Sequence, residues 1–257
     1  MSTPITLSVV TVCRNAAATI EDTLRSVAAQ RYPAIEHIVV DGGSTDGTLE
    51  IIERHRHRIA TFIAGPDRGI YDAMNKGIAA ATGDIVGTLN ADDIYVDEHV
   101  LGKIAAAFAD PAVGACYADL VYVDRGDLNR IVRYWKSRPY TQGLFERGWL
   151  PAHPTFFLRR VLYQRYGGFD LQYRLQADFE LTLRMLAVHK LPSVYLPEVI
   201  VKMRMGGVSN RSVLNVIKGN LEAYRACRRH DLKVSPLFMV RKVLSRLPQF
   251  FRRPPVV

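Results

Sequence analysis

Carboxylates follow two predicted strands of this sequence, at the point where each strand ends. Asp41 closes the run 35–41 (IEHIVVD), and Asp92 and Asp93 follow the run 84–89 (DIVGTL). Adjacent carboxylates at a strand end can bind a hard divalent cation, which takes oxygen ligands and keeps waters and phosphate oxygens in its shell. Such a cation neutralises charge on a diphosphate. The alternative for an isolated Asp-Asp pair is a solvated turn or a helix N-cap.

Asp41 begins a glycine-rich loop, residues 42–47 (GGSTDG). This loop does not match the phosphate-binding pattern G-x-x-x-x-G-K-[ST], and no G-x-G-x-x-G follows a strand. A carboxylate here can accept hydrogen bonds from a nucleotide base N–H or from a ribose hydroxyl. We therefore expect a binding role for Asp41.

Alternating strands and helices position these acids. The predicted elements, in chain order, are Ile5–Cys13 (strand), Ala16–Gln30 (helix), Ile35–Asp41 (strand), Thr48–His57 (helix), Ala60–Ala64 (strand), Tyr71–Ala81 (helix) and Asp84–Leu89 (strand). This alternation predicts an α/β fold whose mostly parallel sheet carries helices on both faces. Ligands bind outside the carboxyl ends of such strands. Asp41 and Asp92 are therefore expected at one edge of one sheet.

The alternation weakens after residue 95. The elements predicted there are Val113–Asp124 and Arg130–Trp135 (paired strands), Gln176–His189 (helix), 205–210 (flexible loop), and Ser212–His230 and Pro236–Leu247 (amphipathic helices). No internal repeat or linker divides the chain.

Composition places the chain among ordinary globular proteins. It has 257 residues, 48% hydrophobic and 23% charged, which excludes disordered and collagen-like classes. The uncharged stretch 1–13 is too short to span a bilayer and lacks the basic start of a signal peptide. Three distant cysteines form neither a disulfide framework nor a zinc site. These features favour a reducing, cytoplasmic location.

Positive charge is concentrated at the C-terminus. The net charge is +9, but residues 202–257 carry +11 and residues 1–201 carry −2. In the predicted helix 236–247, apolar residues share one side, and another side carries Arg241, Lys242 and Arg246. The pattern suits an interfacial helix on an anionic membrane, where each basic residue adds on the order of 1 kcal/mol. The alternative is a helix packed on the protein's own core or on a partner. Nucleic acid is disfavoured because no recognition motif accompanies the charge.

Several segments together resemble the family 2 glycosyltransferases, most closely the bacterial branch that builds O-antigen and capsular polysaccharides. They are VVTVCRNAAATIEDTLRSVAAQRYP, HIVVDGGSTDGT, GPDRGIYDAMNKGIAAATGDIVGTLNADD, HPTFFLRR, YGGFD, QADFELTLRM and MRMGGVSN. They occur in the family's order and spacing, and cover residues 5–210.

The resemblance implies a GT-A fold, a Rossmann-like, mostly parallel mixed sheet flanked by helices, followed here by C-terminal amphipathic helices. The catalytic domain is expected at 1–205, with a nucleotide-sugar half at 1–110 and an acceptor half at 111–205. Residues 206–257 are expected to form a flexible loop and a basic helical tail. A divalent cation, Mn²⁺ or Mg²⁺, is implied as cofactor.

The resemblance also implies a set of donor-binding residues. They are Thr11 and Arg14 near the base, Asp41 on the base or ribose, Asp72, Asn75 and Lys76 against the nucleotide, and Asn90, Ala91 and Asp92 at the family's D-x-D motif. Because Asn stands where the first Asp of that motif often stands, the metal share is expected to fall on Asp92, with Asp93 beside it. Arg204, before the glycine loop, is expected to clamp the donor diphosphate when that loop closes, unless the loop is an ordinary turn.

The family's catalytic base matches Asp178, in the segment QADFELTLRM. A sugar hydroxyl is a weak nucleophile, and a carboxylate in hydrogen-bond reach can take its proton as it attacks the anomeric carbon. A helix N-cap is a second role for Asp178, compatible with the first. Glu180 is the neighbouring candidate, although Arg184 at i+4 favours a structural role. His153 could orient the acceptor or touch the metal, and a surface or core histidine is the alternative.

The expected activity is metal-dependent transfer with inversion by a hexosyl- or N-acetylhexosaminyl-transferase. A sugar would move from a nucleotide diphosphate, taken as UDP, to a lipid-linked glycan at the inner face of the cytoplasmic membrane. One alternative is a sugar nucleotidyltransferase, which needs a Gly-rich basic N-terminal loop, whereas residues 10–15 (VTVCRN) contain no glycine. The other is a non-catalytic scaffold, which would tolerate loss of Asp92 and Asp178.

Overall fold

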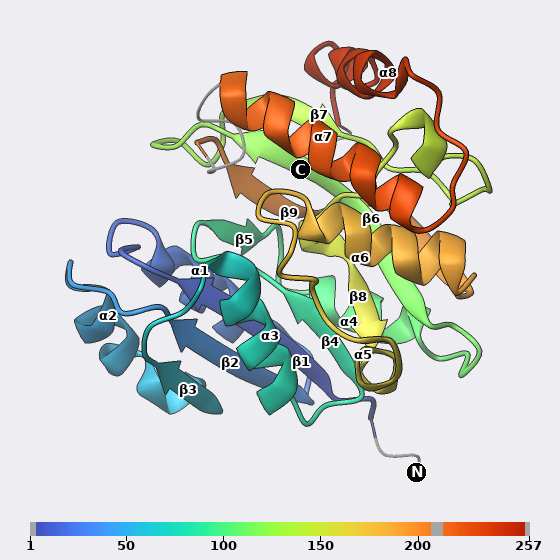
Figure 1. Cartoon of the computed structure of the whole chain (residues 1–257). Helices are drawn as coiled ribbons and strands as arrows, with labels where there is room; N and C mark the ends of the chain where they lie inside the picture. The colour runs from blue at the N-terminus through green and yellow to red at the C-terminus, as the bar shows by residue number, and fades with distance from the viewer. Residues whose placement is uncertain (1–3, 207–212, 255–257) are drawn as a thin grey trace.

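The computed structural model describes residues 4–206 and 213–254, whose strands form one nine-stranded sheet (Figure 1). The sheet order is β3-β2-β1-β4-β8-β6-β9-β5, and β7 pairs with β6. The strands are β1 (Leu7–Cys13), β2 (Ile35–Asp41), β3 (Thr61–Ala64), β4 (Ile85–Thr88), β5 (Asp93–Tyr95), β6 (Ala115–Val123), β7 (Ile131–Trp135), β8 (Phe157–Arg159) and β9 (Ser193–Arg204). The helices are α1 (Ile20–Ala28), α2 (Thr48–Arg54), α3 (Ile70–Ala80), α4 (Val100–Ala107), α5 (Arg160–Tyr166), α6 (Ala177–Leu183), α7 (Val213–Arg229) and α8 (Phe238–Leu244).

The first four strands run parallel, as the alternation predicts. Every residue of β1 is buried, which explains why its sequence is mostly apolar and has no charged residue. Val10 packs with the helix α3 side chains Met74 and Ile78, whereas Val39 packs with the α1 side chain Leu24. The two helices therefore cover opposite faces of the sheet.

The second half of the sheet is mixed. One edge of β6 pairs with β8 near its start and with β7 near its end, both antiparallel, and the other edge pairs with β9 in parallel. The predicted pairing of the strands at 113–124 and 130–135 is confirmed. The sequence interpretation did not include β9, α4 or α5. Strand β9 carries Pro197 within it, a residue that normally argues against a strand inside a sheet.

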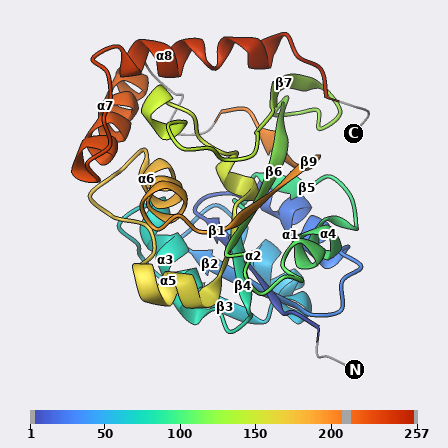
Figure 2. The same ribbon diagram turned by 90° about the vertical axis from the view of Figure 1, so that its right-hand side faces the viewer.

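The C-terminal tail differs from its prediction. Helix α8 is shorter than 236–247, and a 3₁₀ turn with Pro248 follows at Leu247–Phe250. Both figures show α7 and α8 together at the end of the molecule farthest from the N-terminus (Figure 2). The predicted loop 205–210 falls largely outside the described residues.

Lys242 is a correction to the predicted polar face of this helix. Its side chain is buried, whereas the apolar Val240 and Leu244 are about half exposed. The space for Lys242 comes from Gly148, where a Cβ atom would lie 2.6 Å from the Lys242 Cβ. The helix therefore packs its lysine inward and leaves much of its apolar surface in solvent.

Candidate functional site

A cavity of about 970 Å³ opens beside the carboxyl ends of β1 and β4 and reaches the C-terminal tail. Its walls include five of the predicted site residues: Arg14, Asp72, Asp92, His153 and Asp178. Three more predicted residues also line it: Asn90, Ala91 and Arg204. The fold therefore brings most of the predicted residues to one cavity, from segments far apart in the sequence.

Asp178 lies on the cavity wall near the start of α6, with a partner at each carboxylate oxygen. Tyr71 donates its hydroxyl to Oδ1 at 3.1 Å, and His153 Nδ1 lies 3.1 Å from Oδ2. The histidine contact lacks hydrogen-bond alignment, so it is a charge contact when His153 is protonated. Burial, and then the charge of Asp178, raise the pKa of Tyr71 well above its usual range, so its hydroxyl keeps its proton.

The residue before α6 is Gln176, and Asp178 is not the N-cap that its alternative role required. Glu222 of α7 instead accepts hydrogen bonds from the backbone N–H groups of Leu175 and Gln176, at 2.8 and 3.0 Å. The carboxylate of Asp178 therefore does not cap the helix. It keeps acceptor capacity toward the cavity.

The acid loop at 90–93 presents oxygen atoms that suit a cation. Asp92 lines the cavity, and the buried Asn90 Oδ1 and Asp93 Oδ1 accept no hydrogen bond in the described part of the chain. Burial raises the pKa of Asp92, while burial and then the charge of Asp92 raise that of Asp93. No group of three His, Cys, Asp or Glu side chains within residues 4–206 and 213–254 could hold a metal alone. The loop thus fits a cation that completes its shell with phosphate oxygens and water.

Arg204 is the last residue of β9, and its side chain binds this loop. It donates to the Asp92 carbonyl at 3.0 Å and to Asp22 Oδ2 of α1 at 2.5 Å. The guanidinium side of this ion pair is almost fully buried, whereas the Asp22 side chain is partly exposed to solvent. Its charge faces the cavity beside Asp92, where an anionic ligand would meet it.

Four predicted donor residues make internal contacts and do not line this cavity. Thr11 is buried, with its hydroxyl 3.0 Å from His37 Nε2. Asp41 accepts the backbone N–H groups of Gly43 and Ser44, at 2.9 and 2.8 Å, and so shapes its own loop. The other two belong to α3.

Asn75 clamps the backbone of Phe169, donating to its carbonyl and accepting its N–H, both at 2.8 Å. Lys76 donates to the Pro66 carbonyl at 2.7 Å. Asp72 does reach the cavity, and hydrogen bonds from Arg68 are the main reason that its pKa is lowered. The contacts of Lys76 and Asp72 shape the loop before α3, whereas Asn75 holds the loop after α5.

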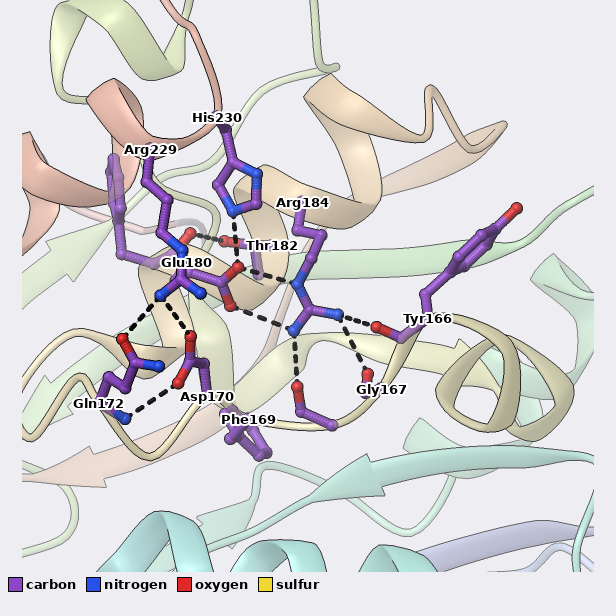
Figure 3. Close-up of polar contacts among 12 residues, drawn as sticks. Tyr166, Gly167, Phe169, Asp170, Gln172, Glu180, Thr182, Arg184, Arg229 and His230 are labelled. Atoms are coloured by element: carbon purple, nitrogen blue, oxygen red, sulfur yellow. Dashed lines mark hydrogen bonds and ion pairs between the residues drawn. The ribbon is translucent and has the colours of Figure 1, made fainter.

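Glu180 faces away from the cavity, into a network shown in Figure 3. Its carboxylate accepts two bonds from Arg184, at 2.8 and 3.1 Å, and one from His230 at 2.8 Å. Burial would raise the pKa of Glu180, but the bonds from His230 and Arg184 lower it overall. Arg184 also donates to the carbonyls of Gly167 and Gly168, so the network ties α6 to the preceding loop.

Sequence reasoning missed several cavity residues, among them Tyr71, Arg133 and Arg246. Tyr71 could have been found, because it stands in the quoted segment PDRGIYDAMNKG next to Asp72. Arg246 was predicted on the basic side of an interfacial tail helix, and it instead lines the cavity. Nothing in the local pattern signals that inward turn.

Comparisons with known proteins place the chain in a family. The family described as Glycosyl transferase family 2 matches residues 8–167. An uncharacterized glycosyltransferase of Mycobacterium tuberculosis is 32% identical over 190 residues, which cover 73% of this chain and 71% of that protein. A PGL/p-HBAD biosynthesis glycosyltransferase of Mycobacterium bovis is 31% identical over 220 residues, 83% of this chain and 82% of that one.

Solved structures share the fold. TarS 1-349 of S. aureus in complex with UDP has a TM-score of 0.66 at 18% identity, covering 92% of this chain and 68% of that one. The mannosyltransferase PcManGT from Pyrobaculum calidifontis, in complex with GDP-Man and Mn²⁺, has a TM-score of 0.66 at 23% identity, covering 95% and 70%. The fold is the GT-A fold that the sequence predicts.

Proposed function

Because the chain belongs to glycosyl transferase family 2, we propose that it is an inverting, metal-dependent hexosyl- or N-acetylhexosaminyl-transferase with a UDP-sugar donor. The observation that carries the proposal is one cavity lined by both Asp178 and Asp92. Such a cavity can hold a nucleotide diphosphate at the acid loop and a sugar hydroxyl at Asp178. Family membership favours glycosyl transfer over the nucleotidyl transfer and scaffold alternatives.

The mechanism assigns one role to each side of the cavity. Asp178 takes the proton of the attacking hydroxyl, and a single displacement inverts the anomeric centre. Tyr71 donates to Oδ1 and so fixes the carboxylate, which leaves Oδ2 and the nearby His153 to face the acceptor. Asp92, with the oxygens of Asn90 and Asp93, would hold Mn²⁺ or Mg²⁺, which supplies positive charge for the leaving diphosphate.

We propose that the acceptor is a lipid-linked glycan, which the protein reaches at the inner face of the cytoplasmic membrane. The tail supports this because its exposed apolar side chains include Leu244, Leu247, Phe250 and Phe251, among basic residues. Within the described residues, no helix has the length and apolar character needed to cross a bilayer.

The decisive experiment measures nucleotide release from a panel of UDP- and GDP-sugars by the full chain with Mn²⁺ and a lipid-linked acceptor. We expect Asp178→Asn to lower kcat about 10²–10⁴-fold, as loss of a general base does. Asp92→Asn should lower the rate and weaken its dependence on Mn²⁺. The matched control is Asp127→Asn, an exposed acid in the turn after β6, which should keep the wild-type rate. Wild-type turnover in Asp178→Asn would refute the assigned base.

A further inference from the structure

Arg133, on β7, is a buried cation with no carboxylate partner among the described residues. Only 9% of the residue is exposed. Its Nε donates to the neutral Gln249 Oε1 at 2.7 Å, and its guanidinium carbon lies 4.7 Å from the Tyr122 ring centre and 5.2 Å from that of Phe250. Burying a charge without a countercharge is costly. The arrangement therefore calls for an anion that comes from outside the chain.

Arg246 adds a second positive charge to the same cavity. It lines the same cavity as Arg133, and no ion pair of Arg246 occurs within residues 4–206 and 213–254. Burial lowers the pKa of Arg133, and the charge of Arg246 lowers it further. Each guanidinium presents its N–H groups in a planar fork that matches phosphate oxygens, and neither has an ion pair among the described residues.

This pair is separate from the acid loop. The registers of four neighbouring strands align Asp93 with Met203, Met203 with Tyr122, and Tyr122 with Arg133. Adjacent strands lie about 4.8 Å apart, so the backbones of Asp93 and Arg133 are roughly 15 Å apart. An anion held at the acid loop and an anion held at Arg133 thus occupy different ends of one cavity.

The pair does lie near the proposed base. Trp135, two residues after Arg133, has its ring 6.1 Å from that of His153, and His153 contacts Asp178 at 3.1 Å. On the other side, the exposed Phe250 and its neighbour Phe251 lead from the arginines to the molecular surface. A phosphate at Arg133 would have room for a sugar on the side of Asp178 and for an apolar chain on the side of the phenylalanines.

We propose that Arg133 and Arg246 form an anion subsite for the acceptor, which binds the phosphate or diphosphate that joins a glycan to a lipid chain. The inference rests on the proposed function, because it takes Asp178 as the base and the acid loop as the donor site. It adds to that function a fixed point that orients the acceptor. Arg133 and Arg246 are binding and positioning residues here, not proton carriers.

The test is a binding titration of the full chain with farnesyl diphosphate. Farnesol and inorganic diphosphate are titrated separately, because each represents one part of that ligand. The chain has two tryptophans, and Trp135 lies 5.8 Å from the Arg133 guanidinium carbon, so intrinsic fluorescence reports on the subsite. We expect Arg246→Gln and Arg133→Gln each to raise the Kd for farnesyl diphosphate about tenfold or more, the usual loss for a charged hydrogen bond. The control Arg241→Gln removes the same charge from an exposed position of α8 outside the cavity and should leave that Kd unchanged.

Three outcomes would overturn the subsite. One is an unchanged farnesyl diphosphate Kd in Arg246→Gln, the variant with the less buried side chain. Another is an equal loss of UDP affinity, which would place the arginines at the donor diphosphate. The third is a loss of binding to phosphatidylcholine–phosphatidylglycerol vesicles without a loss for farnesyl diphosphate, which would assign the pair to bilayer headgroups. If no donor is turned over but arginine-dependent binding persists, the proposed function fails and the subsite stands.

Discussion

Lys242 makes the pH dependence of folding a direct test of how the tail is docked. Its Nζ donates to Gln176 Oε1 at 2.6 Å and lies 4.5 Å from the centre of the Phe179 ring. The pKa of this lysine is lowered from 10.5 to about 7, mainly by burial and also by the charge of Arg246, two residues after the end of α8. Opposing these are Asp178 on α6 and two α7 residues, Cys227 and Glu222, which raise it.

The sign follows from the order in which the two states lose the proton. Below pH 7 the lysine is charged in the folded and unfolded chains alike, and the cost of burying the charge is fully present. Between pH 7 and 10.5 the folded chain has lost the proton that the unfolded chain still binds, so stability rises with pH. The slope is at most about 1.4 kcal/mol per pH unit, which amounts to roughly 2–3 kcal/mol between pH 7.5 and 9.5.

The perturbation is Lys242→Met, which keeps the length of the side chain and removes the titrating group. We expect the free energy of unfolding of the wild type, measured by urea titration, to rise relative to the variant by that amount over that pH interval. Lys233→Met, at an exposed position, should keep the wild-type pH profile. Parallel profiles for wild type and Lys242→Met would show that the lysine is not buried as described, and the docking of α8 would be wrong.

Three further predictions concern packing. Gly148→Ala should destabilise the chain by about 1–3 kcal/mol more than Gly143→Ala in thermal unfolding, because both glycines have positive φ but only the first meets a neighbour, Lys242; equal losses would contradict the contact. Glu180→Gln should cost about 3–5 kcal/mol in urea unfolding, since it leaves Arg184 buried without its acid; a loss below 1 kcal/mol would refute the role of this network. The three cysteines should not react with a thiol reagent at pH 8 until the chain unfolds, because all are buried and burial raises their pKa values; rapid labelling of the native chain would show otherwise.

The sequence predicted the donor half of the fold well, since there each strand and helix is a local pattern. The predicted strand Ile35–Asp41 matches β2 residue for residue. Sheet order is a different matter, because β8 lies between β4 and β6 through pairings such as Val86 with Leu158. That choice depends on contacts between distant segments, which no single window of sequence contains.

The candidate site was predictable where a residue's role follows from its type at a strand or helix end. Asp92, His153 and Asp178 reach the cavity from the positions that the motifs indicated. The packing of the tail was not predictable, because periodicity shows which residues share a side of a helix but not which side packs against the protein. Lys242 faces inward since Gly148 leaves space and Gln176 offers an acceptor, and both lie far from it in sequence.

The position of β9 in the sequence determines when, during synthesis, the acid loop can reach its native conformation. Strand β5 has β9 as its partner in the sheet, and Arg204 at the end of β9 holds the Asp92 backbone. The acid loop is synthesised early, but Arg204, which binds it, follows more than a hundred residues later. Until then the emerging chain carries an unpaired strand edge, the kind of surface that recruits other strands. A fragment ending at residue 167, where the family match ends, would contain every residue of the acid loop but would lack both β9 and Arg204.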